Sequence, residues 1–344
     1  MSPGAGNSGT KIRLTGLDAA RFLAFCGMVL VNFRIAAQVS GGADFPSALT
    51  NAMEGRAAAL FVILAGVGIA LAEPAASLML KRAAFLFVIG MINMTIFDAD
   101  ILHFYALYFI VGTAFLSTPD RGLWVGAAVF ILLGCLGLVL LDYDKGWNWE
   151  TYSYADVWTL AGFLRHSFFN GWHPVVPWVA FLLIGMRIGR MDLQDASTLN
   201  RLVWGGALAA LAALVPQFLT QDPELRLLLG TEAIPPGPFY ILAGTGTACM
   251  TIGIILKAMP YLDKWRLSSW LVIPGRQSLT LYVLHIILGM GVLEEFGLLN
   301  GSLTTWQIFA ISMIFCLLSS VYARLWALGF SRGPLEALMR RVAG

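Results

Sequence analysis

The sequence predicts an all-α, polytopic integral membrane protein, built as a helical bundle of about ten transmembrane helices. Of its 344 residues, 58% are hydrophobic and only 12% are charged, and the mean hydropathy is +0.76. A soluble domain of this length could not bury so much apolar surface. Several apolar runs approach the ~20 residues needed to cross a bilayer, and the sequence lacks the short alternating strands of a β-barrel.

Helices are the expected form of each span, because a helix satisfies its own backbone hydrogen bonds. The ten expected spans cover residues 19–37, 57–73, 83–98, 101–117, 122–141, 174–190, 202–219, 237–258, 277–296 and 304–330. Residues 1–15 are expected to be a disordered cytoplasmic tail, 16–333 the transmembrane domain and 334–344 a cytoplasmic C-terminal tail. No small-residue cleavage signal follows the first span, which we therefore interpret as an anchor.

The distribution of basic residues predicts the orientation of the bundle. With the N-terminus in the cytoplasm, sixteen Lys and Arg residues lie at cytoplasmic ends and loops: Lys11, Arg13, Arg21, Lys81, Arg82, Arg121, Arg187, Arg190, Arg201, Lys257, Lys264, Arg266, Arg276, Arg332, Arg340 and Arg341. Only five face outward: Arg34, Arg56, Lys145, Arg165 and Arg226. This positive-inside bias predicts that both termini are cytoplasmic.

The longest outward segment, 142–173, is rich in aromatic residues. Its second half, about 155–169, could form an amphipathic helix lying on the membrane. The aromatic residues fit a belt at the outer membrane interface. They equally fit a lid or a sugar-stacking platform over a site, and the sequence leaves both interpretations open.

A set of polar residues falls inside or at the ends of the spans, where a bilayer tolerates them only at a cost. Asn32, Asp100, His103 and His173 lie at outer ends, and His285 lies deeper in another span. Histidine suits a general base because its pKa lies near neutrality, and an amide N–H can stabilise an oxyanion. Asp100 and His103 are three residues apart, so the carboxylate could orient the imidazole. The alternative is that these residues only hydrogen-bond neighbouring helices.

Four segments carry short motifs in a characteristic order. They are Leu17-Asp18-Ala19-Ala20-Arg21 with Val31-Asn32, Glu54-Gly55-Arg56-Ala57 with Gly66-Val67-Gly68, Pro177-Trp178 with Gly189-Arg190, and Pro274-Gly275-Arg276 with Tyr282 and His285. Together they resemble DUF418/YeiB-type bacterial membrane proteins and the catalytic domain of heparan-alpha-glucosaminide N-acetyltransferase, within a transmembrane acyltransferase superfamily. The resemblance spans nearly the whole chain.

The resemblance implies a bacterial-type inner (plasma) membrane enzyme that takes an acetyl group from cytoplasmic acetyl-CoA. The group would pass to an amine or hydroxyl of an envelope sugar or similar acceptor at the outer face. The resemblance also implies a catalytic asparagine, matching Asn32, and a histidine about eleven residues later. Here that second position is Ala43, beside Asp44, so the sequence departs from the pattern of the family. The base would then be His103, His173 or His285.

Basic residues at the cytoplasmic side are candidates for the phosphates of acyl-CoA: Arg21, Lys81, Arg82 and Arg276. The positive-inside bias explains them equally well, and Asp18 could simply pair with Arg21. The sequence shows no metal-ligand cluster and no phosphate-binding glycine loop.

The sequence therefore favours a transmembrane acyltransferase that uses acetyl-CoA and no metal. The alternative is a small-metabolite transporter, in which the polar groups would line a passage. The expected partners are acyl-CoA, the acceptor and the lipid bilayer, with a homodimer as a further expectation and no nucleic acid.

Overall fold

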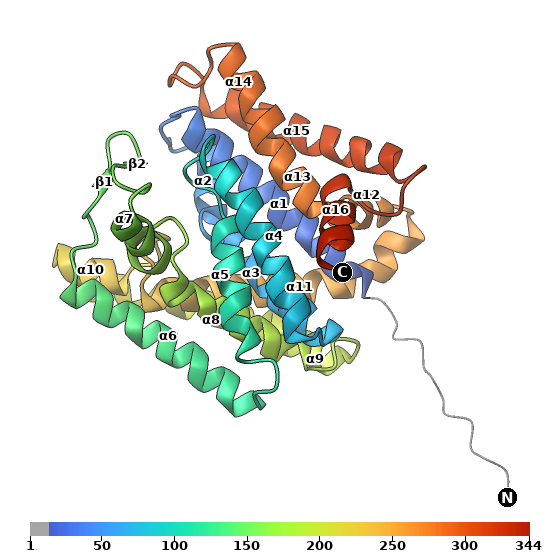
Figure 1. The fold of residues 1–344 in the computed structure, drawn as a ribbon, viewed down its shortest axis with the longest axis horizontal. Helices are drawn as coiled ribbons and strands as arrows, with labels where there is room; N and C mark the ends of the chain where they lie inside the picture. The colour runs from blue at the N-terminus through green and yellow to red at the C-terminus, as the bar shows by residue number, and fades with distance from the viewer. Residues whose placement is uncertain (1–13) are drawn as a thin grey trace, which may run out of the picture.

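The computed structural model describes residues 14–344, apart from the side chains of Pro223, Glu224 and Leu227, and helices make up most of it (Figure 1). The expected disorder of residues 1–15 falls almost entirely outside the described residues, and α1 begins at Thr15. The predicted all-α class of a polytopic membrane protein is confirmed.

Eight stretches of the described chain are long and apolar enough to cross a membrane. Five are single helices: α1 (Thr15–Ala36), α4 (Ala76–Met94), α6 (Asp120–Leu140), α11 (Pro238–Lys264) and α15 (Thr305–Trp326). The other three combine consecutive elements: α2 (Phe45–Met53) with α3 (Arg56–Ala72), α9 (Ala196–Ala213) with η2 (Pro216–Phe218), and α13 (Ser278–Leu284) with η3 (His285–Met290) and α14 (Gly291–Glu295).

The expected count of about ten spans is not reproduced, and two segments account for the difference. The segment 101–117 contains α5 (Leu102–Thr113), whose 12 residues are too few to cross a bilayer. The segment 174–190 contains α8 (Val175–Gly189), which passes the length test only together with the helical stretch Leu160–Asn170, bent from it by 48°. Residues 14–344 therefore hold eight candidate spans, or nine if the bent pair counts as one.

Shorter elements occupy the connections. In the segment 142–173, the strands β1 (Trp147–Asn148) and β2 (Ser153–Tyr154) form an antiparallel hairpin, and α7 (Leu160–Arg165) runs into the π-helix η1 (His166–Asn170). The helix expected at about 155–169 is therefore later and interrupted by a π-turn. The remaining connections contain α10 (Pro223–Leu229), α12 (Ser269–Gly275) and the C-terminal helix α16 (Pro334–Ala343).

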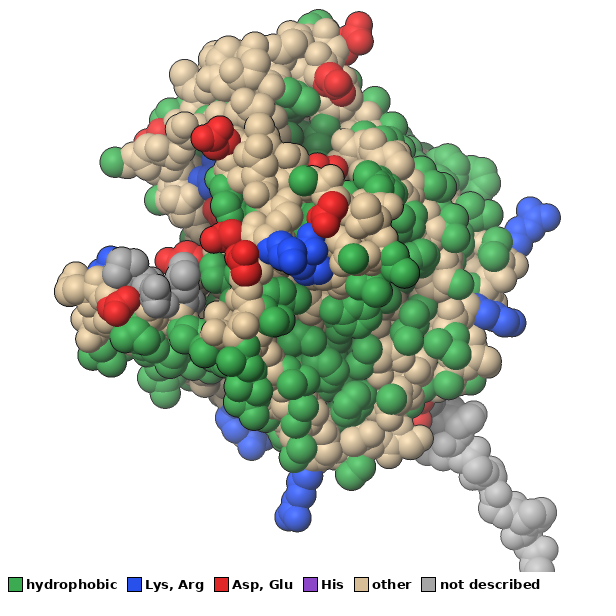
Figure 2. Space-filling model, turned by 60° about the vertical axis from the view of Figure 1, so that its left-hand side comes forward, with side chains coloured by type: hydrophobic (Ala, Val, Ile, Leu, Met, Phe, Trp, Pro, Cys, Tyr) green, Lys and Arg blue, Asp and Glu red, His purple; other side chains and the backbone are tan. Residues whose placement is uncertain are grey.

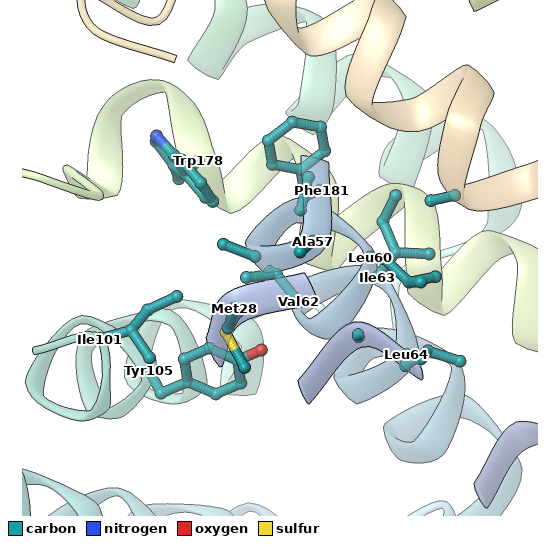
Figure 3. Close-up of a cluster of buried hydrophobic side chains, with 14 of the residues drawn as sticks. Met28, Ala57, Leu60, Val62, Ile63, Leu64, Ile101, Tyr105, Trp178 and Phe181 are labelled. Atoms are coloured by element: carbon teal, nitrogen blue, oxygen red, sulfur yellow. The ribbon is translucent and has the colours of Figure 1, made fainter. Parts of the chain in front are cut away.

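The centre of the bundle is α8, which packs against α3 and α6. Glycines allow α3 and α8 to approach closely: a Cβ added to Gly66 would meet the Leu182 carbonyl oxygen at 2.2 Å, and one on Gly185 would meet that of Ile63 at 2.2 Å. Close contact through small residues is how membrane helices gain packing energy without a hydrophobic driving force. Figure 3 shows side chains of α3 lying between Trp178 and Phe181 of α8 and Met28 of α1.

The helix α2 is fixed at its start by Asp44. The Asp44 carboxylate accepts a hydrogen bond from the Ser47 backbone N–H at 2.9 Å. It also accepts one from the Thr305 hydroxyl at the start of α15. These bonds hold the pKa of Asp44 below its usual value, and the bond from Thr305 has the largest effect. Asp44 is thus an N-cap that ties two spans together.

The C-terminal helix α16 packs against α4 and α13. Its Glu336 carboxylate accepts hydrogen bonds from the backbone N–H of Leu279 at 2.7 Å, from that of Thr280 at 3.1 Å, and from the Thr280 hydroxyl at 2.6 Å. These donors are at the start of α13, where a helix leaves its N–H groups unpaired. The expected tail 334–344 is therefore an ordered helix that caps the span carrying His285.

Candidate functional site

Asn32 and His285 meet inside the bundle, from α1 and from the start of η3. The Asn32 Nδ2 lies 3.0 Å from the His285 Nε2. The His285 Nδ1 contacts the Tyr282 carbonyl oxygen, which can only accept, so Nδ1 carries the proton and Nε2 accepts from the Asn32 amide. The His285 ring is fully buried and is flanked by Phe25 and Phe33. The imidazole therefore fixes the direction in which the Asn32 amide points.

Asp100 and His103 form a second buried pair, as their spacing predicts. The Asp100 Oδ2 lies 3.2 Å from the His103 Nδ1 and accepts a hydrogen bond from the His103 backbone N–H at 3.1 Å. The Asn93 side chain donates to the Asp100 Oδ1 at 3.0 Å. Both members of the pair are 0% exposed. The carboxylate thus orients the imidazole, whose Nε2 has no hydrogen-bond partner within residues 14–344.

Tyr282 connects these two pairs. Its hydroxyl accepts a hydrogen bond from the Ile101 backbone N–H at 3.0 Å. It also lies 3.5 Å from the Asp100 Oδ1, at the limit of hydrogen bonding. Since Tyr282 is one helical turn before His285, the first pair and the second are joined through α13. The motif around Tyr282 and His285 therefore belongs to one network with the polar residues after α4.

A small cavity of about 40 Å³ lies beside this network. Asn32, Ile101, His173 and Tyr282 are among its lining residues, together with Gly55 before α3. A space of this size holds a few water molecules or one small reacting group. Of the three histidines expected as bases, His173 alone lines the cavity together with Asn32.

His173 is held in place by its backbone and its ring. The Tyr108 hydroxyl donates to the His173 carbonyl oxygen at 2.5 Å. The ring lies edge-on to Trp178, with centroids 4.8 Å apart. The buried Nδ1 of His173 has no hydrogen-bond partner among the described residues. This nitrogen is therefore a buried polar atom that the described side chains leave unpaired.

His166 belongs to the same region, although the sequence did not point to it. Its ring stacks near that of His103, with centroids 5.9 Å apart and planes at 21°. Phe104 contacts the rings of His103, His166 and His173. The Nδ1 of His166 is buried and has no partner in the described part of the chain. Figure 2 shows no histidine side chain on the face that it presents, in agreement with this burial.

Two π-helices mark the site. One begins at His166 and the other at His285. A π-turn inserts one extra residue into a helix and is found most often at functional sites. No hydrophobic pattern in the sequence announces such a turn, which explains why His166 was missed. Among residues 14–344, no group of His, Cys, Asp or Glu side chains has the geometry of a metal site.

The four basic residues expected to bind the cofactor do not form a single cluster. Asp18 joins two of them: Arg21 lies 2.6 Å from one carboxylate oxygen and Arg276 lies 3.4 Å from the other. Arg82 lies instead within electrostatic reach of Arg340 in α16. Lys81 is exposed, and no contact among the described residues links it to Arg21 or Arg276. The structure thus separates the four basic residues expected to bind the cofactor into two groups.

Other charged residues of the spans and their ends have structural partners. Arg324, half-buried in α15, donates to the Ser269 hydroxyl at 2.5 Å and lies over the Trp270 ring at 4.1 Å. Arg34 pairs with Glu54 at 2.9 Å. The position of the missing family histidine, Ala43, is exposed at the start of α2. Asp44 beside it accepts the two hydrogen bonds that cap α2 and join it to α15.

Two family models match the chain. The model described as "Heparan-alpha-glucosaminide N-acetyltransferase, catalytic" matches residues 13–216, and the model described as "Protein of unknown function (DUF418)" matches residues 186–344. No curated protein matches the sequence. The first match contains Asn32, Asp100, His103 and His173, and the second contains His285. The resemblance predicted from the motifs is confirmed, and the chain belongs to the family of the heparan-alpha-glucosaminide N-acetyltransferase catalytic domain.

Proposed function

We propose that the protein is a transmembrane acetyltransferase with both termini in the cytoplasm of a bacterial-type inner membrane. It transfers an acetyl group from cytoplasmic acetyl-CoA to an amine or hydroxyl of an acceptor at the outer face. The observation that carries the proposal is the buried contact between Asn32 and His285, linked through Tyr282 to Asp100 and His103. Membership in an acetyltransferase family supports the same chemistry.

The donor would enter at the cytoplasmic end of α1. Arg21 and Arg276, joined by Asp18, offer positive charge for the phosphates of CoA. Asn32 is eleven residues further along α1, a rise of about 17 Å. An extended arm that carries the thioester at its end could therefore place the acetyl carbonyl near Asn32 while its phosphates remain at the arginines.

The chemical step uses the groups around the cavity. The acceptor nitrogen or oxygen attacks the thioester carbonyl, a new C–N or C–O bond forms, and the C–S bond breaks. The Asn32 amide, aimed by His285, stabilises the oxyanion. His173 takes the acceptor proton, because it lines the cavity with Asn32 and has an unpartnered nitrogen. His173 then gives this proton to the departing CoA thiolate, which leaves as the free thiol.

The test is acetyl transfer by purified protein in proteoliposomes, with labelled acetyl-CoA on one side and glucosamine on the other. Wild-type protein should produce N-acetylglucosamine, and His173→Ala should lower the rate by at least ~10²-fold, the typical contribution of a general base. Added imidazole should partly restore the variant. The proposal fails if wild-type protein neither binds nor consumes acetyl-CoA. Flux of the amine in the absence of acetyl-CoA would instead favour the transporter.

A further inference from the structure

A second, larger groove of about 280 Å³ lies beside the site, between the end of α1, the connection after α4, and η3 with α14. Its lining is apolar except for one carboxylate: Ala36, Ile96, Phe97, Ile287, Met290 and Glu294 contribute side chains. Figure 1 shows α14 at the top of the view, where it continues the helix of α13. The groove is seven times the volume of the cavity at Asn32 and could hold a chain rather than a few water molecules.

The groove opens where apolar side chains are exposed. Ile96, which follows the candidate span Ala76–Met94, is 58% exposed, and Ile287, near the middle of the candidate span Ser278–Glu295, is 53% exposed. In a membrane, the middle of a span is surrounded by hydrocarbon tails and not by water. The π-turn η3 supplies Ile287 and Met290, so the irregular helix that fixes His285 also shapes the wall of the groove.

Two residues of the groove wall are directly connected to the reactive network. Ile286 lines the groove, is 0% exposed and directly follows His285. On the opposite wall, the Phe97 carbonyl accepts a hydrogen bond from the Asp100 backbone N–H at 3.1 Å. A chain held in the groove would therefore lie beside the elements that carry His285 and Asp100.

The negative charge of Glu294 at the end of the groove indicates which kind of head group would bind there. The Glu294 carboxylate is exposed and has no hydrogen-bond or ion-pair partner among the described side chains. An unpaired carboxylate at a membrane interface attracts a cation in a medium of low dielectric constant. Among the acceptors of an acetyltransferase, an amine carries that positive charge and a hydroxyl does not.

We infer that this groove binds the apolar chain of an amphiphilic acceptor whose head group carries a primary amine, with Glu294 attracting the ammonium. The inference rests on the proposed function and narrows the acceptor to a long-chain, membrane-held amine. It makes the groove the entry route from the bilayer to the buried network. A matched pair of glycines allows a direct test of this site.

The test uses a long-chain primary amine with a photoreactive diazirine in its chain, and the corresponding alcohol. A Cβ added to Gly291, which lines the groove, meets no atom within 4 Å, and the same holds for Gly205 on α9. Gly291→Phe should fill the groove and lower labelling of η3 at least tenfold, whereas Gly205→Phe should leave it unchanged. Glu294→Gln should lower labelling by the amine and not by the alcohol.

Unchanged labelling in Gly291→Phe would overturn the inference. Equal labelling by the amine and the alcohol, unaffected by Glu294→Gln, would assign the groove to ordinary lipid tails and also overturn it. Acetyl transfer to glucosamine that exceeds transfer to the long-chain amine would overturn the inference and leave the proposed function standing. Groove-dependent labelling without acetyl transfer to either amine would support chain binding and would contradict the proposed function.

Discussion

The amide nitrogen of Asn32 lies 3.0 Å from Nε2 of His285, although the two residues are 253 positions apart in the sequence. Each lies in a different candidate span, and the His285 ring is fully buried. The contact therefore depends on the packing of α1 against α13 and η3. It gives the asparagine, which the family resemblance marks as catalytic, a fixed orientation.

Asn32→Asp should abolish acetyl transfer while preserving the shape of the side chain. A carboxylate accepts hydrogen bonds but cannot donate one to an acyl oxygen, so the oxyanion would lose its stabilisation. We expect kcat to fall by ~10²–10³-fold, the usual effect of removing an oxyanion donor. The measurement is labelled acetyl transfer in proteoliposomes. Asn51→Ala, which removes an exposed amide bonded to Arg34, is the control and should remain active.

Tyr282→Phe should uncouple the two buried pairs. The Ile101 N–H would lose its acceptor, and an unsatisfied buried donor costs about 1–3 kcal/mol. We expect a lower unfolding temperature together with a loss of activity per folded molecule. Ser312→Ala, which removes a buried hydroxyl bonded to the Ile308 carbonyl oxygen on α15, serves as the control. If both variants lose stability and both keep full activity, Tyr282 has a purely structural role.

The pairs close in sequence could be predicted, and the distant ones could not. Asp100 and His103 are three residues apart, and so are Asp18 and Arg21; a single helical turn brings each pair together. The partner of Asn32 could not be found in this way, because it depends on how two spans pack. His285 could be predicted as a candidate base, but not as the partner that orients Asn32.

The number of spans and the role of His166 were missed for local physical reasons. Hydropathy measures the length of an apolar run, whereas α5 ends after 12 residues and α8 begins at a bend of 48°. The π-turn at His166 leaves the composition of its segment unchanged. Hydropathy and composition therefore cannot reveal the three neighbouring rings of His103, His166 and His173.

Asp44 lies beside the position where the family has a histidine. Replacing it by Asn and by Ala distinguishes a structural role of its side chain from a role in the reaction. Asn keeps one oxygen to accept from the Ser47 N–H, and its amide N–H can donate to the Thr305 hydroxyl, so Asp44→Asn should retain both stability and activity. Asp44→Ala should lower the unfolding temperature, because the Ser47 N–H and the Thr305 hydroxyl lose their acceptor. Loss of acetyl transfer in a fully folded Asp44→Asn protein would show that the carboxylate takes part in the reaction.

Arg21→Ala and Arg276→Ala should weaken the binding of acetyl-CoA and leave the binding of the acceptor unchanged. Both guanidinium groups meet at Asp18, where two positive charges can contact phosphates. We expect the KM for acetyl-CoA to rise at least tenfold in each variant, with kcat changed much less. Lys81→Ala is the matched control, because Lys81 does not contact this pair. A larger rise in KM for Lys81→Ala would place the phosphates on the other part of the basic surface.

Glu336 should make the docking of α16 depend on pH. Burial raises its pKa above the usual value of 4.5, even though hydrogen bonds from Thr280 and Leu279 oppose the shift. The folded protein therefore holds this proton more tightly than the unfolded chain does. Stability should decrease as the pH rises from 4.5 through the raised pKa, and then remain constant.

Glu336→Gln should remove this dependence, because the amide is neutral at every pH and still accepts a hydrogen bond. The measurement is the unfolding temperature of wild-type and variant proteins between pH 4.5 and 8. We expect the unfolding temperature of the variant to increase relative to that of the wild type as the pH rises. Glu295→Gln, at an exposed position in α14, is the control and should parallel the wild type. A difference that is the same at every pH would mean that Glu336 keeps one protonation state and acts only through its capping bonds to α13.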